Sequence, residues 1–179
     1  MNLRPRHLIW ICLLALSCAT SQHAPGGSII LKGVPYYSQE AYQCGPASLA
    51  SVLNYWYEGR GVSDRITPEA IGSEIYSPTA RGVLGLDLER YARKRGFTVR
   101  QLTGTFEALT SHIDAGTPPI ILVDYGFGPF QQGHFMVVTG YASGGIVVNS
   151  GARRDAFVAR EELERIWKKT GFWTLVVTP

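Results

Sequence analysis

The sequence changes character near Pro119, and this change limits the folds that the chain can adopt. Before it, apolar residues recur at helical spacing, as in Leu49, Val52, Leu53 and Trp56. After it, β-branched and aromatic residues form runs at 119–125, 135–141 and 146–149. Helices followed by strands predict an α+β domain, in which an N-terminal helical layer packs on a C-terminal antiparallel sheet.

The expected elements follow from these patterns and from the glycine and proline residues between them. Helices are expected at 44–57, 67–76, 86–95, 105–115 and 160–169. Strands are expected at 29–31, 97–102, 119–125, 135–141, 146–149 and 172–177. The turn at 142–145 predicts a β-hairpin between the strands on either side of it.

The N-terminal segment has the pattern of a secretory signal. Arg4 and Arg6 precede an apolar run at 8–16, which is too short to span a bilayer comfortably. A small residue then stands directly before Cys18, a pattern that resembles the lipobox of bacterial lipoproteins. The resemblance implies cleavage before Cys18 and lipid on its sulfur. An ordinary signal peptide, cut at 19–24, is the alternative.

This interpretation divides the chain into a signal peptide (1–17), a flexible tether (18–28) and one globular domain (29–179). The tether is small and polar and contains Pro25-Gly26-Gly27, a composition that buries little. The expected location is the bacterial cell envelope, lipid-anchored and facing the periplasm. Ala19 after Cys18, in place of aspartate, favours the outer membrane.

Charge and composition exclude some classes of function. Of the 17 Lys and Arg residues, Arg4 and Arg6 belong to the signal, which leaves 15 against 14 acidic residues. This balance argues against a nucleic-acid binder. The domain has no cluster of His and Cys at metal-ligand spacing, so neither a metal nor a cofactor is predicted.

Cys44 is the cysteine that the exported domain would retain, because Cys12 leaves with the signal and Cys18 carries the lipid. It is either a buried apolar residue or a reactive thiol. At the start of a predicted helix, backbone N–H groups and the helix dipole should lower its pKa. Gly45 would leave room for a substrate carbonyl.

His134 is the candidate base for this thiol. It follows the glycine-rich segment 126–133 and begins an apolar strand, whereas His112 lies on a predicted solvated helix face. Asn149 ends the paired strand and could orient the imidazole, although Asn149-Ser150-Gly151 also fits a plain turn.

An oxyanion donor is expected from the loop before the nucleophile. Gln39 could fold back over the helix start, and Gln43 is the competing amide. Several aromatic residues could line a cleft or belong to the core, with the core favoured for the first and last of them: Tyr36, Tyr37, Tyr42 and Phe127.

Two sequence blocks together resemble a known family. The block 39–55, which contains Cys44-Gly45-Pro46-Ala47-Ser48, and the block Gly133–Val138, followed by Asn149, are similar to the bacteriocin-processing peptidase-like family of the papain superfamily. The resemblance covers nearly the whole chain after the tether.

The resemblance implies a papain-like fold and a role for each of four residues. Cys44 would be the nucleophile, His134 the base, Gln39 the oxyanion donor and Asn149 the residue that orients the imidazole. Many relatives have Asp where Asn149 stands, which weakens that assignment. Transporter-fused members remove double-glycine leaders, but this sequence has no transporter segments, so that substrate is not carried over.

The expected function is therefore that of a cysteine peptidase, which cleaves peptide or amide bonds in the cell envelope through a Cys-His-Asn triad. Its expected partners are a peptide or protein substrate, the membrane through the lipid, and an envelope protein, with no nucleic acid. The alternative is a catalytically silent papain-like lipoprotein that binds a peptide or acts as an adaptor.

Overall fold

The computed structural model of the chain describes residues 24–38 and 43–179. The predicted signal peptide, Cys18, Gln39 and Tyr42 lie outside these residues. The helices are α1 (Cys44–Gly59), α2 (Pro68–Ile75), α3 (Gly85–Lys94), α4 (Phe106–Asp114) and α5 (Arg160–Trp167), and a 3₁₀ turn, η1 (Lys168–Thr170), continues α5.

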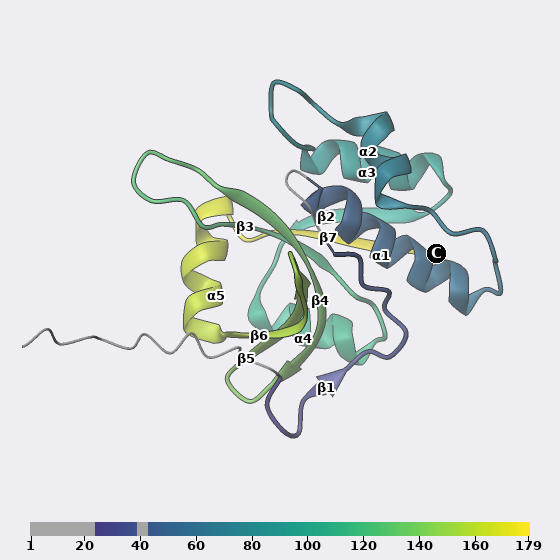
Figure 1. Cartoon of the computed structure of the whole chain (residues 1–179). Coiled ribbons are helices and arrows are strands. Elements are labelled where there is room, and N and C mark those ends of the chain that lie inside the picture. The colour runs from purple at the N-terminus through teal and green to yellow at the C-terminus, as the bar shows by residue number, and fades with distance from the viewer. Residues whose placement is uncertain (1–23, 39–42) are drawn as a thin grey trace, which may run out of the picture.

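One twisted antiparallel sheet connects the described strands. They are β1 (Ile29–Ile30), β2 (Thr98–Thr103), β3 (Ile120–Asp124), β4 (Gly133–Ala142), β5 (Gly145–Ser150), β6 (Arg153–Ala159) and β7 (Trp173–Thr178). Their order is β2-β7-β3-β4-β5-β6, and β1 pairs with the far end of β4. Figure 1 shows α1, α2 and α3 grouped on one side of this sheet and α5 on the other.

Each face of the sheet has its own apolar core, as the alternation along β4 shows. Phe135 and Val137 pack in the core that α1 and α3 cover. Met136 and Val138 point the opposite way, into the core that α4 and α5 cover. The α+β class is confirmed, but helices cover both faces of the sheet and not one face alone.

Most predicted elements are present, and two differences affect the candidate site. Strand β6 was not predicted, although it pairs with β5 along its length. Phe127 was expected in the core and is 89% exposed, so that prediction is wrong. None of the helices in the described residues is long and apolar enough to cross a bilayer.

Candidate active site

Cys44 is the first residue of α1, and its sulfur lies against the strand that carries His134. The thiol accepts the backbone N–H of Phe135, the residue directly after His134, and the N–H groups of Cys44 and Gly45 also point to it. The rest of this turn and the next is buried, so the helix start is fixed by the core beneath it. The structure thus places the sulfur beside the peptide unit that joins His134 to Phe135.

Gly45 is required by packing. A Cβ at this position would lie 2.1 Å from Cγ2 of Val83 and 3.3 Å from the Phe135 ring. From the sequence, Gly45 is expected to leave room for a substrate carbonyl. The contacts show that it also lets the start of α1 approach β4 and the loop before α3 closely.

The pKa of Cys44 is raised above its ordinary value, contrary to the sequence-based expectation. Desolvation by burial is the largest cause, and it outweighs the backbone N–H groups of Phe135, Gly45 and Cys44, which lower the pKa. The helix start does supply the donors that were expected. Burial takes away more stabilisation of the thiolate by water than these N–H groups provide. The resting thiol is therefore neutral near pH 7.

His134 is half-buried near the start of β4, and its ring contacts Ser150 at the end of β5. Nε2 of His134 lies 2.9 Å from Oγ of Ser150, and the ring of Tyr125 lies 6.0 Å away, centre to centre. Burial lowers the pKa of His134, and the positive charge of Arg153 on β6 lowers it further. The resting imidazole is therefore neutral near pH 7.

Asn149 faces away from the imidazole in this structure. Its side-chain oxygen accepts the backbone N–H of Asp155, 3.1 Å away, and it pairs in register with Val137, on the α1 face. The hydrogen bond that Asn149 was expected to make is made by Ser150. Asn149 and Ser150 are consecutive residues of one strand, so their side chains point to opposite faces of the sheet.

A β-bulge explains this exchange. The hairpin pairs Ala142 with Gly145, and an unbroken register from there would place Asn149 opposite Val138, on the His134 face. The register shifts by one residue at Thr139, so Val138 pairs with Val148 and Asn149 with Val137. A shift of one residue turns every later side chain to the other face.

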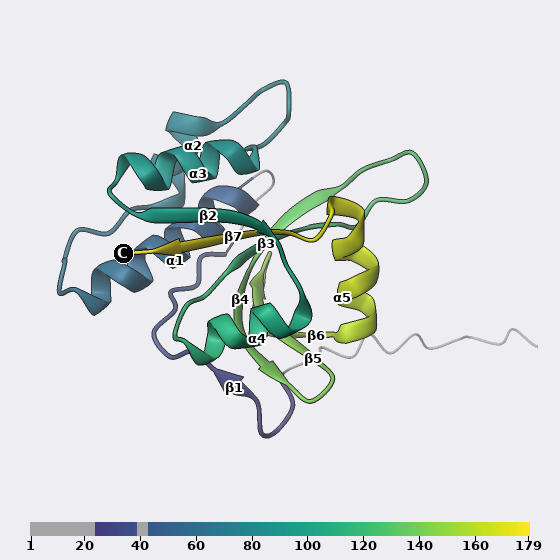
Figure 2. The same ribbon diagram turned by 180° about the vertical axis from the view of Figure 1, so that it is seen from behind.

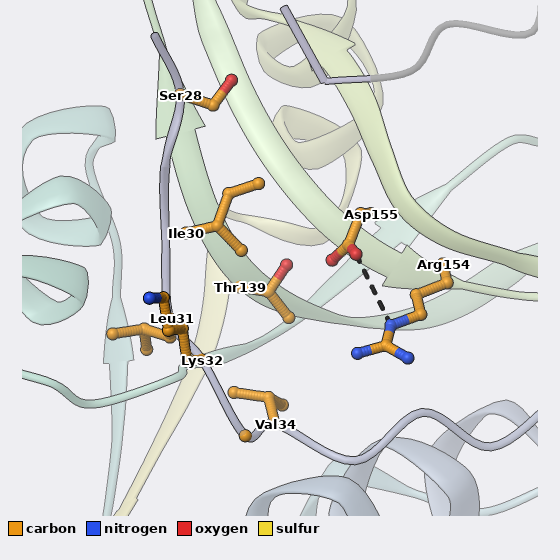
Figure 3. Close-up of a pocket in the computed structure, with 9 residues that line it drawn as sticks. Ser28, Ile30, Leu31, Lys32, Val34, Thr139, Arg154 and Asp155 are labelled. Atoms are coloured by element: carbon orange, nitrogen blue, oxygen red, sulfur yellow. Dashed lines mark ion pairs between the residues drawn. The ribbon is translucent and has the colours of Figure 1, made fainter. Parts of the chain in front are cut away.

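Two hollows of the described surface lie at elements that border the site. One, of about 440 Å³, flanks the start of α1 and is lined by Gln43, Pro46, Pro68, Glu69, Gly72, Ser73 and Tyr76. The other, of about 410 Å³, lies between the β1 segment and β6, where Arg154 and Asp155 form an ion pair of 3.5 Å (Figure 3). Cys44, His134 and Asn149 are not among the described residues that line either hollow. In residues 24–38 and 43–179, no group of three or more His, Cys, Asp or Glu residues could hold a metal ion.

A cysteine at the start of a buried helix, against the antiparallel strand that carries a histidine, is the arrangement of the papain-like cysteine peptidases. The profile of the Peptidase_C39 like family matches residues 31–174. The chain therefore belongs to this family and is a cysteine peptidase. A search of the curated proteins finds no match.

Solved structures show the same fold. A protein of Bacillus anthracis described as a C39-like peptidase has a TM-score of 0.67 at 20% identity, over 85% of this chain and 98% of that one. The double-glycine motif protease of an AMS/PCAT transporter, solved with its leader peptide, has a TM-score of 0.64 at 25% identity, over 88% and 98%. The peptidase domain of Streptococcus ComA has a TM-score of 0.62 at 21% identity, over 82% and 98%.

Proposed function

We propose that this peptidase cleaves peptide or amide bonds with Cys44 as nucleophile and His134 as base. The observation that carries the proposal is the position of the Cys44 sulfur against the Phe135 N–H, one residue from His134. Nε2 of His134 is engaged by Ser150. The ring nitrogen left for the thiol is Nδ1, which lies nearer the backbone that the sulfur contacts.

The proton transfers follow from this tautomer. In the proposed tautomer, Nε2 carries the ring hydrogen and donates it to Oγ of Ser150, 2.9 Å away, which leaves Nδ1 as an acceptor. The Cys44 proton moves to Nδ1 as the sulfur attacks the carbonyl carbon. The imidazolium then protonates the leaving amine as the C–N bond breaks, and water hydrolyses the thioester.

The oxyanion is held by backbone and side-chain donors. The N–H of Cys44 belongs to the free first turn of α1, where an anion is stabilised. Gln39 remains the proposed side-chain donor, and it lies outside the described residues. Ser150 supports orientation of the imidazole in the place proposed for Asn149. Its hydroxyl is neutral, so it orients the ring without stabilising an imidazolium as a carboxylate would.

The natural substrate is proposed to be a peptide or protein in the cell envelope. One structural neighbour, the AMS/PCAT protease, was solved with a leader peptide, and this supports binding of a peptide by the shared fold. We further propose that the mature chain is anchored through lipid on Cys18. Mass spectrometry of the exported protein should find an acylated N-terminus at Cys18, and an unmodified N-terminus at residues 19–24 would exclude the anchor.

A second candidate function is supported by the neutral resting pair. A raised thiol pKa and a base without a carboxylate also fit a papain-like domain that binds peptides without cleaving them. Screening envelope peptides and peptidoglycan fragments separates the two functions. Cleavage by the parent that is lost in Cys44→Ala supports the peptidase, and peptide binding without turnover in both proteins supports the binding domain.

A further inference from the structure

The loop between β3 and β4 exposes the two most exposed large apolar side chains of the described surface. Phe127 is 89% exposed and Phe130 is 78% exposed. Figures 1 and 2 both show this loop projecting beyond the sheet, on the side where α5 lies. We call residues 125–132 the aromatic hairpin. A contiguous exposed apolar patch is a mark of a contact site for a protein or a membrane.

The aromatic hairpin is an ordered turn. Oδ1 of Asp124 accepts the N–H groups of Gly126 and Gln132, each at 2.7 Å. The N–H of Phe130 donates to the carbonyl of Phe127 at 3.1 Å, and Tyr125 donates to Gln132 at 3.0 Å. The two rings are therefore displayed by a hydrogen-bonded scaffold, and they lie at the tip of a convex projection.

Cationic groups surround the base of the hairpin. Nζ of Lys169 donates to the carbonyl of Gly126 at 2.6 Å, and Lys168 is exposed beside it on η1. The acidic groups here are already engaged. The Asp124 carboxylate is buried and hydrogen-bonded, and Glu162 pairs with Arg165 at 2.7 Å. The surface near the two rings thus combines apolar area with positive charge.

We propose that the aromatic hairpin inserts Phe127 and Phe130 into the interfacial region of a bilayer that contains anionic lipids. Aromatic rings flanked by lysines have the composition of interfacial membrane contacts. A convex tip with nearly bare rings suits insertion into a soft surface better than it suits cradling a peptide, which needs a concave site.

The contact would set the orientation of the active site. His134 follows Phe130 by four residues in the strand that leaves the hairpin. A hairpin held in the headgroup layer therefore places the base close to the membrane surface. The tether predicted at 18–28 would by itself leave the domain free to turn. The membrane contact itself requires none of the proposed catalytic chemistry, and the quenching measurement tests it without a cleavage assay.

Quenching by brominated lipid tests the contact. The full chain carrying Phe127→Trp is mixed with phosphatidylcholine vesicles, with and without phosphatidylglycerol, whose acyl chains are brominated. We expect quenching beyond that of the parent, stronger with phosphatidylglycerol, and weakened when Lys168→Glu and Lys169→Glu are added. The matched control is Tyr76→Trp, because Tyr76 is 47% exposed at the end of α2, away from the hairpin.

Two results would overturn the inference. One is equal quenching of the two tryptophan variants, or none beyond the parent, on anionic vesicles. The other is a loss of soluble-peptide cleavage in Phe127→Ser/Phe130→Ser without vesicles, which would assign the hairpin to the substrate site. Unchanged soluble cleavage, together with quenching specific to Phe127→Trp, supports the membrane contact.

Discussion

The Cys44 sulfur lies against the N–H of Phe135, the residue after His134, and different forces position Cys44 and His134. Cys44 is positioned by core packing, because the first turn of α1 is buried and a side chain on Gly45 would meet Val83 and Phe135. His134 is positioned by strand register and by one hydrogen bond, to Ser150. The helix that carries the proposed nucleophile therefore has a local sequence signal, although core packing fixes its place, whereas the position of the proposed base depends on how distant strands align.

Gln39→Ala tests the nucleophile side and should have the largest effect. Removal of one oxyanion donor costs on the order of a hundredfold to a thousandfold in turnover, with little effect on binding. We expect kcat to fall by about that factor while KM and the thermal unfolding midpoint stay near those of the parent. Gln43→Ala is the control. If kcat falls in Gln43→Ala and stays near the parent value in Gln39→Ala, the oxyanion donor is Gln43.

Gly45→Ala tests the packing that holds the thiol. The new methyl group would meet Cγ2 of Val83 at 2.1 Å, so the loop before α3 or the start of α1 must move. Overpacking of this kind costs about 1–3 kcal/mol in the free energy of unfolding. Urea unfolding should show this loss, and Val83→Ala should restore part of it.

The control for that experiment is another helical glycine in the same layer. A Cβ on Gly72 of α2 would meet only Cγ of Pro46, at 3.8 Å, which is an ordinary contact. Gly72→Ala should therefore leave stability unchanged or raise it by about 0.5–1 kcal/mol, because alanine favours a helix over glycine. Equal losses in both variants would show that Gly45 has no special packing role.

Ser150→Ala tests how His134 is oriented, and comparison with Asn149→Ala distinguishes the roles of the two residues. Without its hydrogen bond to Nε2 the imidazole loses orientation, and we expect kcat/KM to fall about tenfold, the value of one hydrogen bond of roughly 1–1.5 kcal/mol. Asn149→Ala should instead lower the free energy of unfolding by about 1 kcal/mol, because it leaves the Asp155 N–H unpaired. A larger loss of kcat/KM in Asn149→Ala would return the orienting role to Asn149.

The same contrast decides what the sequence can predict. The helix at Cys44 was predicted because apolar spacing and a start signal are local, and α1 indeed begins at that residue. Strand β6 was missed because it starts with Arg153, Arg154 and Asp155 and forms the sheet edge, where apolar alternation is weak. Ser150 was missed because the bulge at Thr139 leaves no local signal, yet it decides which of two neighbours faces His134.

The pKa directions show a further limit of local reasoning. A helix start lowers a thiol pKa, and the three N–H donors at Cys44 do act in that direction. The net shift of the Cys44 pKa depends on how far the surrounding core buries the thiol, and only the folded structure shows that burial. Burial also lowers the pKa of His134, so the two shifts together favour a neutral resting pair over an ion pair.

Arg153→Ala should have the smallest effect, and it tests the electrostatics of the base. Arg153 is exposed on β6, and its positive charge adds to burial in lowering the pKa of His134. Its removal raises this pKa toward the ordinary value without reaching it, because burial remains. Since the base must be neutral, the acid limb of the kcat/KM profile should move to higher pH. At a pH below the ordinary histidine pKa of about 6.5, kcat/KM should be about twofold lower than in the parent, as expected for an exposed charge. The difference should shrink at high salt, which screens such a charge.

Arg154→Ala is the control, because its guanidinium pairs with Asp155 and does not contribute to the His134 shift. An acid limb that moves to lower pH in Arg153→Ala, or moves equally in both variants, would show that the limb reports another group.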